Sequence, residues 1–130
     1  MEYIKREDLT ENIAIIKINK SYREGLSEKE LYDVTRGCWK RKLESVSNAE
    51  YVLAVSSGIV REVYDVDKWV EAEDLHRETI QFDARVEKGR VGFHGKIAVP
   101  EIREKYIGKY VNNLYKRGEA GPVKLFLKED

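Results

Sequence analysis

The sequence predicts an α+β fold, in which a small curled or barrel-like mixed β-sheet carries two or three helices. Short apolar or alternating segments typical of strands recur along the chain, and only two clear helical patterns interrupt them. Five or six strands in 130 residues favour a sheet that curls on itself. Without a linker or repeat, residues 1–130 are expected to form a single domain with one core.

The first elements are a strand and a helix. An isoleucine-rich run over residues 12–19 is typical of a buried strand. Ser27 and Glu30 have the spacing of a capping box, which opens a helix of about two to three turns. Gly37 is placed to end that helix.

Two β-hairpins are predicted next. A buried strand over residues 51–55 is followed by the Ser57-Gly58 turn and a β-branched strand over 59–66. Apolar and polar residues then alternate over 80–87 and again over 91–99, on either side of a Lys-Gly turn. These two alternating segments predict a second hairpin whose apolar face points inward.

The last elements are a helix, an irregular piece and a strand. Pro100 is suited to the first helical position, and Glu101 favours the N-terminal turn electrostatically. Gly108 is expected to end or bend this helix, and residues 110–115 then form a short helical or irregular piece. The apolar segment 123–127 predicts the final strand.

Composition excludes several classes of protein. The chain is 42% hydrophobic and 37% charged with a formal net charge of zero, and its apolar runs are too short to cross a membrane. The first residues lack the apolar core of a secretory signal, and the lone Cys38 cannot form a disulfide framework. We therefore expect a cytoplasmic protein without a membrane partner. Composition says nothing about its oligomeric state.

A local basic segment carries the clearest chemical signal. Residues 35–42 contain Arg36, Lys40, Arg41 and Lys42 without an acid, next to the aromatic Trp39. Aromatic rings beside guanidinium and ammonium groups are suited to stacking a base and neutralising its phosphates. The predicted nucleic-acid site is therefore centred on this segment.

The predicted site extends beyond this segment. Trp39, Arg36 and Tyr22 are expected to line one concave site, with the indole as stacking face and the guanidinium as a planar donor. Arg23 lies beside Tyr22 in the loop before the helix, where a rigid scaffold presents side chains to ligands. The remaining predicted site residues are Lys40, Arg41, Trp69 and Lys109, the last from a second basic strip of dispersed phosphate contacts.

Each of these residues also has an ordinary structural interpretation, which the sequence leaves open. Trp39 and Trp69 are large enough to cover the core, and Tyr22 to cover one end of the sheet. Arg36 lies on one helical face with Glu28 and Tyr32 and can pair with either of them. Lys109 can be a plain surface lysine.

The sequence favours a protein that is not an enzyme and uses no cofactor, although it leaves the question open. His76 and His94 lack the neighbours of a metal site, so we expect none. Cys38 has basic neighbours but no signature of a nucleophile. The chain also lacks a glycine-rich phosphate loop and a nucleophile elbow.

Most of the chain resembles a poorly characterised prokaryotic domain that occurs alone or attached to restriction-type proteins. The resemblance rests on NKSYREGLSEKELYDVTRGCW (19–39), YVLAVSSGIVREVYDVDKW (51–69) and FHGKIAVPEIREKYIGK (93–109). The hairpin ending in VYDVDKW also resembles the centre of PUA-like domains, which include the EVE and YTH readers of modified bases.

This resemblance implies a small β-barrel with helices between its strands and a concave site for a nucleotide or flipped base. Tyr22, Tyr32 or Tyr64 would complete an aromatic cage there. We therefore expect a PUA-like domain that binds DNA or RNA and reads a modified or unpaired base. The alternatives are a structural or protein-interaction module and a small nucleotide-processing hydrolase.

Overall fold

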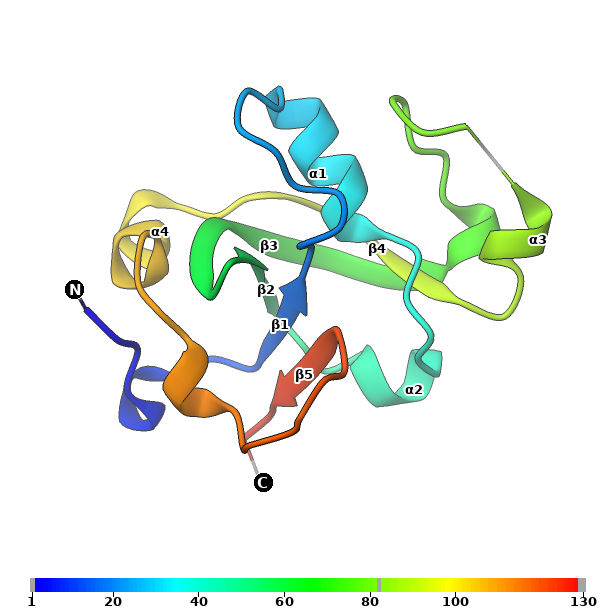
Figure 1. The fold of residues 1–130 in the computed structure, drawn as a ribbon. Helices are drawn as coiled ribbons and strands as arrows, with labels where there is room; N and C mark the ends of the chain where they lie inside the picture. The colour runs from blue at the N-terminus through cyan, green and yellow to red at the C-terminus, as the bar shows by residue number, and fades with distance from the viewer. Residues whose placement is uncertain (1, 82, 129–130) are drawn as a thin grey trace.

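The computed structural model describes residues 2–81 and 83–128, which form an α+β fold around one mixed sheet (Figure 1). The strands lie in the order β4-β3-β2-β1-β5. The pair β1 and β2 is parallel, and every other neighbouring pair is antiparallel. The α+β class and the mixed sheet are confirmed. The strands are β1 (Ile13–Lys17), β2 (Tyr51–Ser56), β3 (Ile59–Glu71), β4 (Val91–Ile97) and β5 (Val123–Phe126).

The sheet is open, so the barrel-like closure expected from the sequence is wrong. Strands β4 and β5 are its two edges. The free edge of β4 is covered by helix α1 and by the residues that follow it, and not by another strand. Trp39 forms a β-bridge with Val91, and the Gly95 N–H donates to the Tyr32 hydroxyl at 2.8 Å. Register shifts in the β2-β3 and β3-β4 pairings mark bulges, which increase the local twist of a sheet.

Both faces of the sheet are buried, which explains the continuous apolar run in β1. Ile13 and Ile15 belong to one hydrophobic cluster, and Ala14 and Ile16 belong to another. Because side chains alternate along a strand, these two clusters lie on opposite faces. The single core expected from the sequence is therefore divided in two by the sheet.

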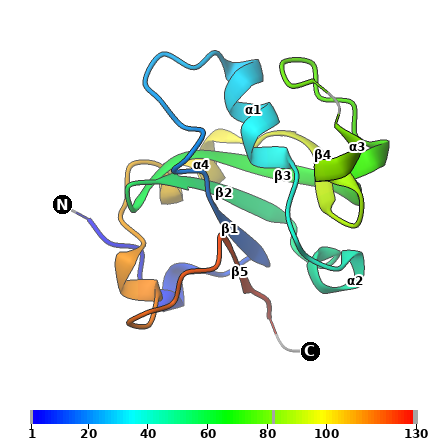
Figure 2. The ribbon, with the colours of Figure 1, turned by 45° about the vertical axis from the view of Figure 1, so that its right-hand side comes forward.

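Different helices cover the two faces. The helices α1 (Glu28–Arg36) and α2 (Leu43–Val46) contribute side chains to the cluster around Ala14. Helix α4 (Pro100–Tyr106) and the 3-10 helix η3 (Asn112–Leu114) pack with the cluster around Ile13. Figures 1 and 2 show α4 at one end of the sheet, while α2 and the short α3 (Ala84–Glu87) lie at the other.

The elements predicted from short-range sequence patterns are confirmed. The Ser27 hydroxyl accepts from the Glu30 N–H, and the Glu30 carboxylate accepts from the Ser27 N–H, each at 3.1 Å, before a nine-residue α1 that ends at Gly37. Pro100 opens α4, and the final strand is β5. The irregular piece predicted over 110–115 contains η3.

The prediction of a second hairpin is wrong for its first strand, residues 80–87. Part of the predicted strand over 80–87 is the helix α3, residue 82 lies outside the described residues, and the hairpin partner of β4 is the long strand β3. The physical reason is Glu87, which is 2% exposed and accepts from the Asp83 N–H at 2.9 Å. This contact closes a helical turn, and Val86 is left 46% exposed. The described residues contain four α-helices, because α2 and α3 add to the expected set.

Candidate nucleic-acid interface

The segment that leaves α1 is held against the edge of β4. The Trp39 N–H donates to the Val91 carbonyl, and the Trp39 carbonyl accepts from the Val91 N–H, both at 2.9 Å. The Trp39 ring is half-buried against the cluster around Ala14, and its Nε1–H donates to the Thr35 carbonyl at 2.8 Å. With this donor occupied, the indole nitrogen has no hydrogen left to donate to a base.

Two adjoining hollows are lined by residues that follow Trp39 in the chain, although Trp39 itself lines neither of them. The basic hollow, about 430 Å³, is lined by Lys40, Arg41, Lys42, Glu44, Ser45 and Gly89. The Leu43 hollow, about 690 Å³, is lined by Arg41, Lys42, Leu43, Glu44, Ser47, Glu71 and Gly89. Both volumes fall within the range of about 300–1,000 Å³ that small-ligand sites occupy.

The cations of these hollows are not neutralised within the fold. Lys40 and Lys42 are exposed, and Arg41 is half-buried with its Nη1 donating to the Val123 carbonyl at 2.9 Å. Among the described residues, no carboxylate lies within salt-bridge distance of these three side chains. Their positive field is therefore directed to solvent, where it can attract an anion.

Arg36 is part of the fold. It is 6% exposed, its Nε donates to Asp33 at 2.9 Å and its Nη2 donates to the His76 carbonyl at 3.0 Å. Its guanidinium also stacks 4.5 Å from the centre of the Tyr32 ring, so the pairing with Tyr32 is confirmed. The bidentate donor role expected for Arg36 conflicts with these contacts, because two of its donor groups are occupied inside the protein.

The other predicted site residues lie outside the lining of both hollows. Tyr22 is half-buried with the Arg61 guanidinium 4.9 Å from its ring centre, and Arg23 pairs with Glu30 at 3.3 Å. Trp69 is 8% exposed, and its Nε1–H donates to the Ala49 carbonyl at 3.0 Å. It is therefore a residue of the core. Lys109 lies 3.7 Å from Glu2. From the predicted set, the hollows bring together Lys40 and Arg41.

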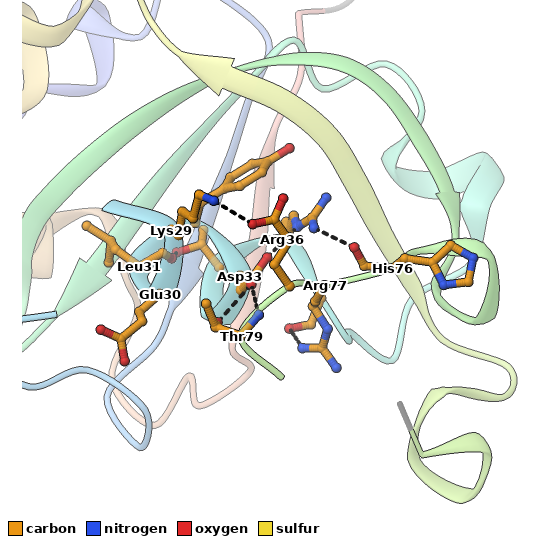
Figure 3. A network of polar contacts seen from close by, with 12 residues as sticks. Lys29, Glu30, Leu31, Asp33, Arg36, His76, Arg77 and Thr79 are labelled. Atoms are coloured by element: carbon orange, nitrogen blue, oxygen red, sulfur yellow. Dashed lines mark hydrogen bonds and ion pairs between the residues drawn. The ribbon is translucent and has the colours of Figure 1, made fainter. Parts of the chain in front are cut away.

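A buried polar network connects the end of α1, just before Trp39, with the loop that follows β3 (Figure 3). Asp33 is 1% exposed, and besides Arg36 it accepts from the Thr79 N–H at 2.7 Å and the Thr79 hydroxyl at 2.8 Å. These bonds tie the loop after β3 to the last turns of α1. The sequence analysis missed Asp33, although its three-residue spacing to Arg36 is a recognisable helical pair.

A second buried pair fixes the residues next to Trp39. Arg77 donates to the Gly37 carbonyl at 3.0 Å and to Glu87 at 3.3 Å, and the pair is at most 8% exposed in its side chains. The Cys38 thiol lies 3.6 Å from the Glu87 carboxylate. Burial raises the pKa of Cys38, and the Glu87 charge acts in the same direction against Arg77. These contacts disfavour the thiolate that a nucleophile requires.

The described residues offer little for other chemistry. Burial lowers the pKa of His94, and the charges of Arg36 and Lys68 lower it further. No group of three or more histidine, cysteine or acidic side chains is placed to hold a metal within the described part of the chain. Within the same part, no helix is both long and apolar enough to cross a bilayer.

Comparisons with protein-family models, with curated proteins and with solved structures found no match. The resemblance to PUA-like domains therefore stays a prediction.

Proposed function

We propose that this chain is a PUA-like nucleic-acid-binding domain without enzymatic activity, which holds an unpaired or modified base of DNA or RNA. The observation that carries the proposal is that Lys40, Arg41 and Lys42 lie in the lining of two adjoining hollows and, among the described residues, form no salt bridge with an acid. A cytoplasmic location belongs to the same proposal, in keeping with the lone cysteine.

Local charge supports this function despite the zero net charge of the chain. Phosphate contacts act over short distances, because physiological salt screens exposed charges beyond about 8 Å. A nucleic acid placed in the hollows therefore responds mainly to Lys40, Arg41 and Lys42, with Glu44 and Glu71 opposing them. We expect weak binding with a small number of phosphate contacts.

Trp39 supports a base beside these phosphates. It directly precedes the cations, and its half-buried ring is held by hydrogen bonds on both its backbone and its indole nitrogen. A ring fixed in this way loses little entropy when a base stacks on it, and such stacking contributes about 1–3 kcal/mol per base. Recognition by stacking tolerates different bases.

The test is a charge-removal experiment with a matched control. Lys40→Ala/Lys42→Ala should weaken binding of a fluorescent single-stranded oligonucleotide and reduce the slope of log K against log salt by about 1.4, from about 0.7 per phosphate contact. The control, Lys5→Ala/Lys20→Ala, removes two other exposed lysines, and Lys20 lies at the opposite end of β3 from Glu71. Equal salt slopes in the two variants would contradict a phosphate role for the basic hollow.

A further inference from the structure

The two hollows differ in chemistry. The basic hollow has three cations and one acid, whereas the Leu43 hollow has two cations, two acids and an apolar side chain. Glu71 reaches the Leu43 hollow from the end of β3, while Leu43 and Ser47 belong to α2 or its end. The Leu43 hollow thus combines an apolar side chain and two cations with two carboxylates, Glu44 and Glu71.

The Glu71 carboxylate has unused acceptor capacity. Among the described residues it has neither a hydrogen-bond donor nor a cation as a partner, although Arg41 and Lys42 line the same hollow. A carboxylate accepts hydrogen bonds through two oxygens and donates none. Glu71 is exposed, so a ligand in this hollow pairs with its carboxylate by presenting N–H or O–H groups in place of water.

Resting on the proposed nucleic-acid binding, we propose that Glu71 makes the Leu43 hollow selective for an unpaired guanine. The Watson–Crick edge of guanine carries two adjacent donors, N1–H and the N2 amino group, which match the two oxygens of one carboxylate. Adenine and cytosine present an amino group beside an acceptor nitrogen, and thymine and uracil place a single N–H between two carbonyl oxygens. These acceptors repel the carboxylate.

The remaining lining residues complete the position of the nucleotide. Leu43 offers an apolar surface to one face of the base, and the adjoining basic hollow receives the phosphate through Lys40 and Lys42. Glu44 lines both hollows alongside the cations, whereas Glu71 lines only the larger one. Glu71 is therefore the residue that separates base recognition from phosphate binding.

The inference is tested by fluorescence anisotropy with four oligothymidylates that carry G, A, C or T at the central position. We expect the wild-type protein to bind the guanine oligonucleotide about tenfold more tightly than the others, as a good bidentate contact provides. Glu71→Gln should abolish this preference and leave the affinity for the all-thymine oligonucleotide unchanged or raised. Inosine, which keeps N1–H and lacks the amino group, should bind with intermediate affinity.

The control is Glu73→Gln, which changes an exposed acid two residues further along and outside the lining of the hollow. It should keep the guanine preference. Absence of binding to all four oligonucleotides would overturn the proposed function together with this inference. Binding with equal affinities, or a preference that survives in Glu71→Gln, would overturn the inference alone.

Discussion

Replacing Asp33 by alanine is the sharpest test of what holds the candidate interface in place. The Asp33 side chain is 1% exposed, and its two oxygens accept from the Arg36 Nε at 2.9 Å and from the Thr79 N–H at 2.7 Å. Alanine removes the acceptors and leaves the Arg36 guanidinium buried without its counter-charge. The expected consequence is a large loss of stability.

The magnitude follows from this burial. Breaking a buried ion pair by removing one partner costs about 3–5 kcal/mol, because the remaining charge is left desolvated and unpaired. An exposed pair such as Arg23–Glu30, with side chains 67% and 36% exposed, is expected to contribute far less. Domains of this size have an unfolding free energy of roughly 5–15 kcal/mol, so Asp33→Ala should remove a substantial part of it.

Urea unfolding of three variants separates the charge effect from the loss of packing. Asp33→Ala should be less stable than Asp33→Ala/Arg36→Met, because the second change removes the stranded charge and keeps an apolar side chain of similar length. Arg36→Met alone should cost less than Asp33→Ala, since Asp33 retains both bonds from Thr79. If Asp33→Ala loses under about 1 kcal/mol, or the double variant is the least stable, the reasoning about a stranded buried charge is refuted.

Two further predictions concern Trp39 and Glu11. Trp39→Phe loses the hydrogen bond to Thr35, which should cost about 1 kcal/mol of stability, but it should keep most of the oligonucleotide affinity. Trp39→Ala should weaken oligonucleotide binding by about 1–3 kcal/mol. Equal affinities of the two variants in a titration would exclude stacking. Burial opposes the charge of Glu11, but hydrogen bonds from Thr10 and Tyr106 and the charge of Lys105 hold its pKa below 4.5. Because the pKa of Glu11 is lower in the folded than in the unfolded state, its carboxylate stabilises the fold at any pH above the unfolded-state pKa of 4.5. This contribution is lost as the pH falls from 4.5 through the folded-state pKa. Glu11→Gln should therefore flatten the acid side of the stability curve measured by thermal melts, and an unchanged curve would contradict this assignment.

The parts of the fold that the sequence predicted well are those determined by neighbours in the chain. A capping box and an N-terminal proline act within one helical turn, so Ser27 and Pro100 locate α1 and α4. Residues 13–16 of β1 are all apolar because the strand is buried on both faces. For α1, the capping pattern and the hydrogen bonds that explain it lie in the same segment.

The errors have long-range causes. Residues 80–87 alternate like a strand, but a carboxylate at 87 bound by Arg77 determines the conformation, and the alternation does not reveal this contact. Helix α2 has four residues, too few to be stable alone, and depends on burying Val46. Gly92 also depends on a residue that is remote in sequence, because its lack of a side chain allows the Arg36 carbonyl to approach closely.

The candidate site divides in the same way. Lys40 and Arg41 follow directly from the local basic segment, and the structure places both at the hollows. Arg36 has the same charge but a different environment, because Asp33 lies one helical turn before it. Glu71 joins the site only through the packing of β3 beside α2, which no local pattern of charge or spacing encodes.

The zero net charge of the chain gives little information about binding, because the charges are not equivalent. Asp33–Arg36 and Glu87–Arg77 cancel inside the protein, where both members of each pair are at most 8% exposed in their side chains. These pairs enter the formal sum, yet they contribute almost no field at the surface. Lys40 and Lys42 enter the same sum with exposed side chains, and the half-buried Arg41 enters it without a salt bridge among the described residues. Removing Lys40 and Lys42 should therefore alter nucleic-acid affinity more than removing two lysines elsewhere, although both changes shift the net charge equally.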